Sequence, residues 1–178
     1  GWFRQCGFND DLPIMHVIVY TLRGLLECSL MKNKTVDDLQ IMPAVIKGAD
    51  FLCQALQEQP VRSIRGMVPT EFDESWQSRA KDSCLTGNAQ LACFLYRLSH
   101  CTGNQYFRGV SDSVVSAVKR TQLVETTMLP IKGAVAGTFP LSHGYVPNGY
   151  PNWAAKFFAD ALMMKMNYEK LIINNKLI

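Results

Sequence analysis

Apolar residues along the chain recur with the spacing of α-helices, and turn-forming residues separate the segments. The run HVIVYTLRGLLE, residues 16–27, belongs to a first predicted helix at about 13–31, and a second ends near Gln57. Further helices are expected at about 86–100, 105–122 and 152–167, with the turn CTGN, residues 101–104, after the first of these. The pattern therefore predicts an all-α fold.

Polar residues mark where some of these helices should begin. Thr35 is a predicted N-cap, with Asp37 and Asp38 in the first turn that follows. Pro43 lies inside the same predicted helix and is expected to kink it. Asn152 is expected to cap the last helix.

A short segment occurs twice in the chain. IRGMVPTEF begins at Ile64 and IKGAVAGTF begins at Ile131, an offset of 67 residues, and each follows a polar helix. Each unit thus reads as an apolar helix, a turn, a more polar helix and a short extended piece, with units at about 13–72, 84–139 and 150–178. We expect the first helix of each unit to be inner and the second outer, in helical-hairpin repeats that form part of an α/α toroid. Two and a half hairpins do not close a six-hairpin ring, so an upstream half, an open arc or an oligomer is expected.

Three stretches carry a resemblance to a known group. PIMHVIVYTLRGLLE, SCLTGNAQLACFLYRL and GYPNWAAKFFADAL resemble an uncharacterised group of bacterial α/α-toroid proteins, related to six-hairpin glycosidases and terpenoid-cyclase-like toroids. The resemblance spans nearly the whole chain and corresponds to the C-terminal half of such a toroid. It departs at Ile14 and Met15, where a polar residue is preferred before the histidine. The resemblance implies an architecture, and the group supplies no activity to carry over.

Polar side chains form lines on otherwise apolar helices. On the first helix the positions i, i+4, i+7 and i+11 are His16, Tyr20, Arg23 and Glu27, and on the last helix Asn152, Lys156 and Asp160 follow each other at intervals of four. The 67-residue offset sets Arg23 opposite Gln90 and Tyr20 opposite Gly87. A buried polar group without a partner costs about 1–3 kcal/mol, so these lines predict one water-filled pocket between inner helices. Alternatively, Arg23 with Glu27 and Lys156 with Asp160 are ion pairs on helix surfaces.

Two loops add candidate ligand contacts. Trp76 and Trp153 could stack on a sugar ring, although a tryptophan buried under a loop is the commoner arrangement. Asp73 and Glu74 supply carboxylates beside Trp76. The loop before the last helix suits a lid over the cavity, and it contains His143, a candidate acid or base.

Composition narrows the functional classes. Hydrophobic residues make up 48% and charged residues 19% of 178 residues, which is typical of a globular domain, and the net charge of +3 comes without a basic cluster, which argues against nucleic-acid binding. No apolar run reaches the length of a membrane span. The six cysteines fit buried, reduced thiols of a cytoplasmic protein, and their spacing matches no familiar zinc site. No phosphate-binding loop occurs, so neither a metal nor another cofactor is expected.

Three functional hypotheses remain open at this point. The first is a carbohydrate-active domain that processes a glycan or a uronate, with His16, Tyr20, Arg23 and Glu27 as catalytic candidates and Trp76, Gln90, Asn152, Trp153 and Lys156 as substrate-binding candidates. The second is a non-catalytic module that binds a glycan or a protein. The third is an isoprenoid-handling toroid, for which Asp37 and Asp38 form the only acidic pair on a predicted helix.

Overall fold

The computed structural model describes residues 2–4, 6–7, 12–31, 40–58 and 64–175. In the last of these ranges the side chains are described as far as residue 169. Within these ranges the chain is mostly helical, as predicted. The helices are α1 (Met15–Ser29), α2 (Ile41–Gln57), α3 (Leu85–Thr102), α4 (Gln105–Lys119) and α5 (Asn152–Asn175), with a short 3-10 helix η3 (Leu129–Ile131). The strands β1 (Ser83–Cys84) and β2 (Thr138–Phe139) form one antiparallel pair. No described helix is long and apolar enough to cross a membrane.

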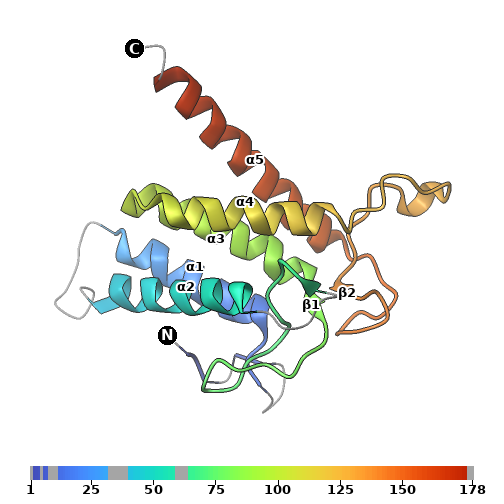
Figure 1. Cartoon of the computed structure of the whole chain (residues 1–178), viewed down its shortest axis with the longest axis horizontal. Coiled ribbons are helices and arrows are strands. Elements are labelled where there is room, and N and C mark those ends of the chain that lie inside the picture. The colour runs from blue at the N-terminus through green and yellow to red at the C-terminus, as the bar shows by residue number, and fades with distance from the viewer. Residues whose placement is uncertain (1, 5, 8–11, 32–39, 59–63, 176–178) are drawn as a thin grey trace.

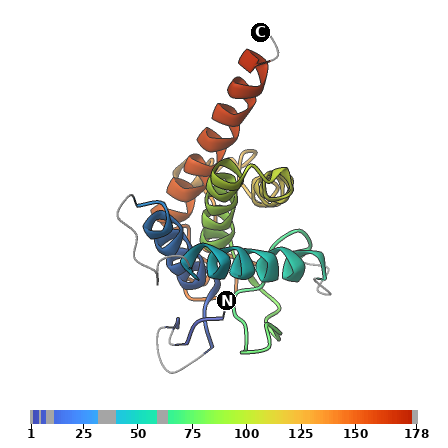
Figure 2. The same ribbon diagram turned by 90° about the vertical axis from the view of Figure 1, so that its left-hand side faces the viewer.

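Helix α3 lies at the centre of the molecule. It packs against α1, α4 and α5, and fourteen of its eighteen residues are buried. Helix α2 packs against α1, so α1 and α2 form one hairpin and α3 and α4 form the next (Figure 1). Figure 2 shows α1, α3 and α5 next to one another, with α5 extending beyond the other helices. The first helices of the three predicted units are therefore neighbours.

The twice-occurring segment has the same local structure in both copies. Gly66 and Gly133 both adopt the left-handed conformation, with φ of 83° and 81°, in a turn where the residue after the glycine donates its N–H to the isoleucine three positions earlier. The chain then pairs with the residue that precedes the unit's own first helix. Glu71 forms an antiparallel bridge with Ile14, and Thr138 pairs with Cys84. Each hairpin is thus closed by an equivalent bridge.

These bridges correct the register expected for the helices. Ile14 and Cys84 are equivalent and stand 70 residues apart, whereas Glu71 and Thr138 stand 67 apart. Glu71 follows Ile14 by 57 residues and Thr138 follows Cys84 by 54, so the first unit is three residues longer and the 67-residue offset holds for the extended segments only. With the offset of 70, Tyr20 corresponds to Gln90 and Arg23 to Cys93, so the expected pairings of Tyr20 with Gly87 and of Arg23 with Gln90 are wrong.

Several helix ends follow from local chemistry. Gly103 ends α3 in the left-handed conformation with φ of 73°, and the Asn104 side chain accepts a hydrogen bond from the Tyr106 N–H at the start of α4. Pro43 lies in the first turn of α2, where proline is tolerated, so the expected kink is wrong. Asn152 is the first helical residue of α5 instead of its cap, and α5 continues past the expected end at 167. The predicted Thr35 cap, with Asp37 and Asp38, lies outside the described residues.

The core corrects two expectations about single residues. Trp76 is only 9% exposed, and its ring stacks on Phe51 with centroids 5.2 Å apart while also contacting Phe72. It therefore holds the loop against α2 and is not available to a sugar. All six cysteines are free thiols, but Cys28 is exposed instead of buried.

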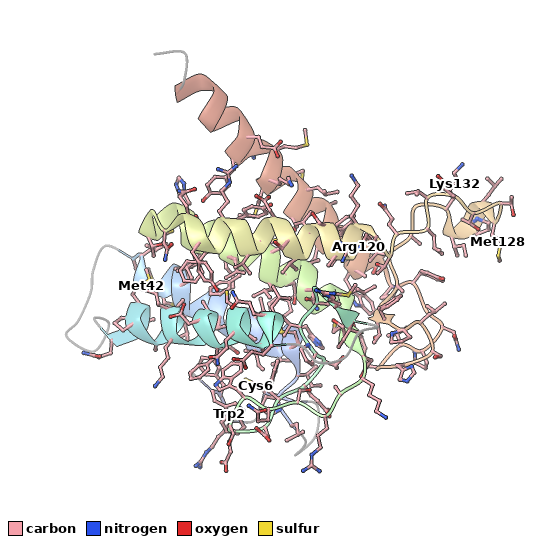
Figure 3. The ribbon with its side chains drawn as sticks, viewed as in Figure 1. Trp2, Cys6, Met42, Arg120, Met128 and Lys132 are labelled. Atoms are coloured by element: carbon pink, nitrogen blue, oxygen red, sulfur yellow. The ribbon has the colours of Figure 1, made fainter. Side chains whose placement is uncertain are left out.

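One segment projects from the helices. Figure 3 shows Met128 and Lys132 well away from the bundle, beyond Arg120 at the end of α4. Its base is held by the N–H groups of Leu123 and Gly133, which donate to Ala134 and Leu123 respectively. This segment contributes nothing to the face formed by α1, α3 and α5.

Candidate functional site

A cleft of about 510 Å³ lies between α1, α3 and α5. Four of the sequence-predicted site residues line it, together with Asp160: Tyr20 and Arg23 from α1, Gln90 from α3, and Lys156 from α5. The rest of the lining is mostly apolar and comprises Val19, Cys93, Phe157, Met163, Met164 and Asn167. The cleft thus has the usual composition of a small-molecule site, in which a few polar groups stand among apolar walls.

Gln90 is the most unusual residue of this cleft. Gln90 belongs to the central helix α3, and the residue is only 5% exposed. Neither Nε2 nor Oε1 has a hydrogen-bond partner among the described residues. Buried polar side-chain atoms are nearly always paired, because leaving one unpaired costs about 1–3 kcal/mol. Gln90 is therefore a donor and an acceptor held ready at the cleft wall.

The charged residues of the cleft are already paired within their own helices. Lys156 lies 2.6 Å from Asp160, and its ammonium group is 4.1 Å from the centre of the Phe157 ring. Arg23 donates from Nε to Oε1 of Glu27 at 3.0 Å. Both pairs are partly solvent-exposed, so they contribute little to stability and leave N–H groups for a ligand.

Glu27 is placed outside the cleft lining and joins two helices. Arg97 of α3 forms two hydrogen bonds of 3.0 Å with its carboxylate, in addition to the bond from Arg23. The bonds from Arg97 lower the pKa of Glu27 below its usual value. A carboxylate bound by two guanidinium groups is a poor proton acceptor, and the contacts of Glu27 suit it to holding Arg23 and Arg97 in position.

His16 also lies outside the cleft lining, at the N-terminal end of α1. Its ring is 5.4 Å from that of Tyr145, and its Nδ1 is 3.8 Å from Sγ of Cys84. Burial lowers the pKa of His16 and raises that of the Cys84 thiol to about 11, so both groups are neutral at pH 7. His16 is therefore separated from Arg23 and Lys156, with which it was expected to share a pocket.

The remaining predicted residues surround this same end of the helices. Asn152 is exposed at the start of α5. Trp153 is 46% exposed, and its Nε1 donates to the hydroxyl of Tyr145 at 3.1 Å. The loop before α5 therefore packs on the N-terminal ends of α1 and α3, and its residues do not line the cleft. His143 is exposed there, with Nδ1 3.1 Å from the hydroxyl of Ser142.

Sequence reasoning missed several contributors that the 70-residue offset would have found. The polar line of α1 then corresponds to Thr86, Gln90, Cys93 and Arg97 on α3. Arg97 is the equivalent of Glu27, and these two residues are bound to each other. Cys93 corresponds to Arg23 and lines the cleft, where burial raises its thiol pKa to about 12. The sequence did not indicate that methionines of α5 line the cleft, because apolar residues are ordinary on a helix that is mostly apolar.

The cleft offers few carboxyl groups for acid–base catalysis. Among the described residues that line the cleft, Asp160 is the one carboxylate, and it is bound to Lys156. The carboxylate of Asp73 accepts hydrogen bonds from the N–H groups of Ser75 and Gln77 and shapes its own loop. Within the described residues, no group of three or more histidine, cysteine, aspartate or glutamate side chains is arranged to hold a metal ion. The cleft is suited to hydrogen bonding, ring stacking and contact with an anion.

Comparison with known proteins gave no match: no family model, no curated protein and no solved structure is similar to this chain at a significant level.

Proposed function

We propose that the cleft between α1, α3 and α5 binds a saccharide. The observation that carries this proposal is the unpaired, buried amide of Gln90 in the wall of a cleft of about 510 Å³. Such a volume falls in the range of about 300–1,000 Å³ that small-molecule sites occupy. An amide offers both a donor and an acceptor, as sugars require, and the binding of a ligand would recover the free energy that its isolation costs.

The neighbouring residues support a polar ligand with a flat apolar face. Tyr20 is 55% exposed, and its ring stands nearly perpendicular to that of Phe157, with centroids 5.9 Å apart. The exposed part of the Tyr20 ring can contact a sugar ring. Arg23 and Lys156 line the same cleft and can donate to hydroxyl or carboxylate oxygens. The carboxylate of Asp160 can accept a hydrogen bond from a sugar hydroxyl while it stays paired with Lys156.

Binding is better supported than glycoside hydrolysis. Hydrolysis uses two carboxyl groups about 5–9.5 Å apart, one of them protonated. In the described part of the chain, Asp160 is the single carboxylate of the lining, and Glu27 is engaged by two arginines. A non-catalytic glycan-binding module therefore accounts best for the arrangement.

Uronate processing is a second candidate, favoured by one observation. The hydroxyl-bearing Tyr20 and the cation Arg23 share the cleft with Lys156. Lyases and epimerases of uronates need a base beside cations that neutralise the carboxylate. If the protein is such an enzyme, Tyr20→Phe abolishes turnover of oligouronates while their binding persists. If the wild-type protein binds oligouronates without altering them, uronate processing is rejected and the non-catalytic binding module is retained.

We also propose that the hairpins α1–α2 and α3–α4 are consecutive units of a helical toroid, with α5 as the inner helix of a third. The equivalent bridges of Ile14 and Cys84 support a repeat. Inner helices in such an assembly share one concave face, and the cleft is lined by the three helices to which we assign this position.

The proposed function is tested by titrating oligosaccharides into the protein and recording heat. Tyr20→Ala is expected to weaken binding about tenfold, since loss of a stacked ring costs about 1–1.5 kcal/mol. Tyr106→Ala serves as the matched control, because Tyr106 is similarly exposed, at 46%, but lies on α4 away from the cleft. The absence of binding by neutral, acetylated and acidic oligosaccharides alike would reject the proposal.

A further inference from the structure

The polar atoms of Gln90 restrict the ligand beyond its being a sugar. Nε2 donates and Oε1 accepts, and both are unpaired. A carboxylate only accepts, so it would leave Oε1 without a partner, and an ammonium group only donates, so it would leave Nε2 without one. The acetamido group of an amino sugar is a trans amide, whose N–H and C=O point in opposite directions, so a single glutamine side chain meets only one of them. Its carbonyl can accept a hydrogen bond from Nε2 while a hydroxyl of the same sugar donates to Oε1, and the two groups together satisfy Gln90.

The surroundings of Gln90 in the cleft are apolar. Val19 of α1, Cys93 of α3 and three side chains of α5, namely Phe157, Met163 and Met164, share the lining with it. Burial raises the pKa of the Cys93 thiol to about 12, which keeps that side neutral as well. Figure 2 shows the three helices that contribute these side chains. A methyl group is the complement of such walls, whereas a charged group would lose its hydration there.

Access to Gln90 requires the movement of a lining side chain. Both polar atoms are covered in the free protein, each exposing less than 1 Å². Met163 and Met164 are unbranched and adapt their shape at low cost, so they are the members of the lining that can give way. A ligand group that reaches Gln90 is therefore small.

We propose that the cleft recognises the acetamido group of an N-acetylated amino sugar. In this arrangement the carbonyl of the acetamido group accepts from Nε2 of Gln90, a neighbouring hydroxyl of the sugar donates to Oε1, and the methyl group packs among Val19, Phe157 and the methionines. The sugar ring lies toward Tyr20, within reach of Arg23 and Lys156 at the cleft mouth. This inference rests on the proposed function, because it names the class of saccharide that the same cleft binds.

The experiment titrates four probes into the full chain: the trimers of N-acetylglucosamine and of N-acetylgalactosamine, cellotriose, and trigalacturonate. We expect at least one acetylated trimer to bind more than tenfold tighter than cellotriose, which has hydroxyls in place of the acetamido groups. Burial of the methyl group alone accounts for about fourfold. Gln90→Met, which keeps the volume and removes the amide, is expected to abolish this preference. Gln54→Met, on the exposed face of α2, should leave it unchanged.

The possible outcomes separate the two proposals. Binding of cellotriose or trigalacturonate as tight as that of both acetylated trimers overturns the acetamido assignment and leaves saccharide binding in place. Binding of an acetylated trimer that persists unchanged in Gln90→Met also overturns the assignment. No binding of any of the four probes overturns both this inference and the proposed function.

Discussion

Two amide side chains, two residues apart on α3, are buried to nearly the same extent and have opposite surroundings. Asn88 faces the bridge that precedes α3 and forms four hydrogen bonds: Oδ1 accepts from the Val68 N–H, and Nδ2 lies within bonding distance of the Val68 carbonyl, the Ser83 hydroxyl and the Cys84 carbonyl. Gln90 faces the cleft and forms none with the described residues. The first amide holds the fold together, and the second costs stability.

The contrast teaches how to distinguish a structural polar residue from one kept for a ligand. Burial alone does not separate them, because Asn88 is 0% and Gln90 5% exposed. The difference lies in what the opposite elements offer: the segment after α2 presents backbone groups to Asn88, while α1 and α5 present side chains and open space to Gln90. Substitutions at the two positions should therefore change stability in opposite directions.

The largest effect is expected for Asn88→Ala. The change leaves the Val68 N–H without a partner in the interior and removes the other bonds of the amide, although the Val68 carbonyl keeps its bond from the Ser83 hydroxyl. This should lower the free energy of unfolding by about 3 kcal/mol. For a chain of this length the melting temperature then falls by roughly 6–12 °C. Thermal unfolding followed by circular dichroism measures the shift. A decrease within the noise of surface substitutions would mean that Asn88 does not hold the bridge.

Gly87, the neighbour of Asn88 on α3, lies close against the N-terminus of α1. A methyl group on Gly87 would meet the His16 backbone nitrogen and the Met15 side chain, both at 3.0 Å, so Gly87→Ala should cost about 1–3 kcal/mol. Gly24→Ala is the control, because nothing lies within 4 Å of the added methyl group on the exposed side of α1. That control should stabilise α1 by up to about 1 kcal/mol. Urea unfolding of both variants tests the pair, and equal signs would show that α1 does not approach α3 this closely.

Gln90→Met should act in the opposite direction from Asn88→Ala. Replacement of an unpaired amide by an apolar side chain of similar volume removes a desolvation cost, so the free energy of unfolding should rise by about 1 kcal/mol. Gln54→Met on the surface of α2 should change it by less than about 0.5 kcal/mol. Chemical denaturation gives both values. A loss of stability in Gln90→Met would indicate that the amide has a partner in the folded protein.

The smallest effect concerns the ion pairs beside the cleft. The pKa of Glu27 is lowered in the folded protein, chiefly by its bonds from Arg97, so its contribution to stability is present above the ordinary carboxyl pKa and disappears as the pH falls through the lowered one. Because its side chain is 42% exposed, this contribution should not exceed about 1 kcal/mol. Wild type and Glu27→Gln should therefore differ at pH 7 and converge in acid, as unfolding curves at several pH values would reveal. A gap that widens on acidification would contradict this origin.

The sequence pattern predicted the helices well because their apolar periodicity is strong and local. The helices at 15–29, 85–102 and 105–119 lie close to their expected bounds. The polar line on α1 led correctly to Tyr20 and Arg23, and the line on α5 to Lys156, because each line follows from helical geometry within one element. The relation between elements was harder, since the 67-residue spacing of the extended segments says nothing of the three-residue difference in length between the two units.

The errors at single residues have the same origin. Trp76 was given a ligand role from its position before an inner helix, and its stacking on Phe51 depends on α2, which no local pattern predicts. His16 falls on the same helix face as Arg23, but the distance along α1 carries it out of the cleft to Tyr145. A shared helix face therefore predicts direction and does not predict a shared pocket.

The most direct measurement follows the side-chain amide signals of Asn88 and Gln90 by nuclear magnetic resonance, assigned by their loss in Asn88→Ala and Gln90→Met, while an N-acetylated trisaccharide is added. The account predicts that the NH₂ signals of Gln90 shift with saturation at the affinity found by calorimetry, while those of Asn88 stay in place. Binding that leaves the Gln90 signals unmoved would contradict it.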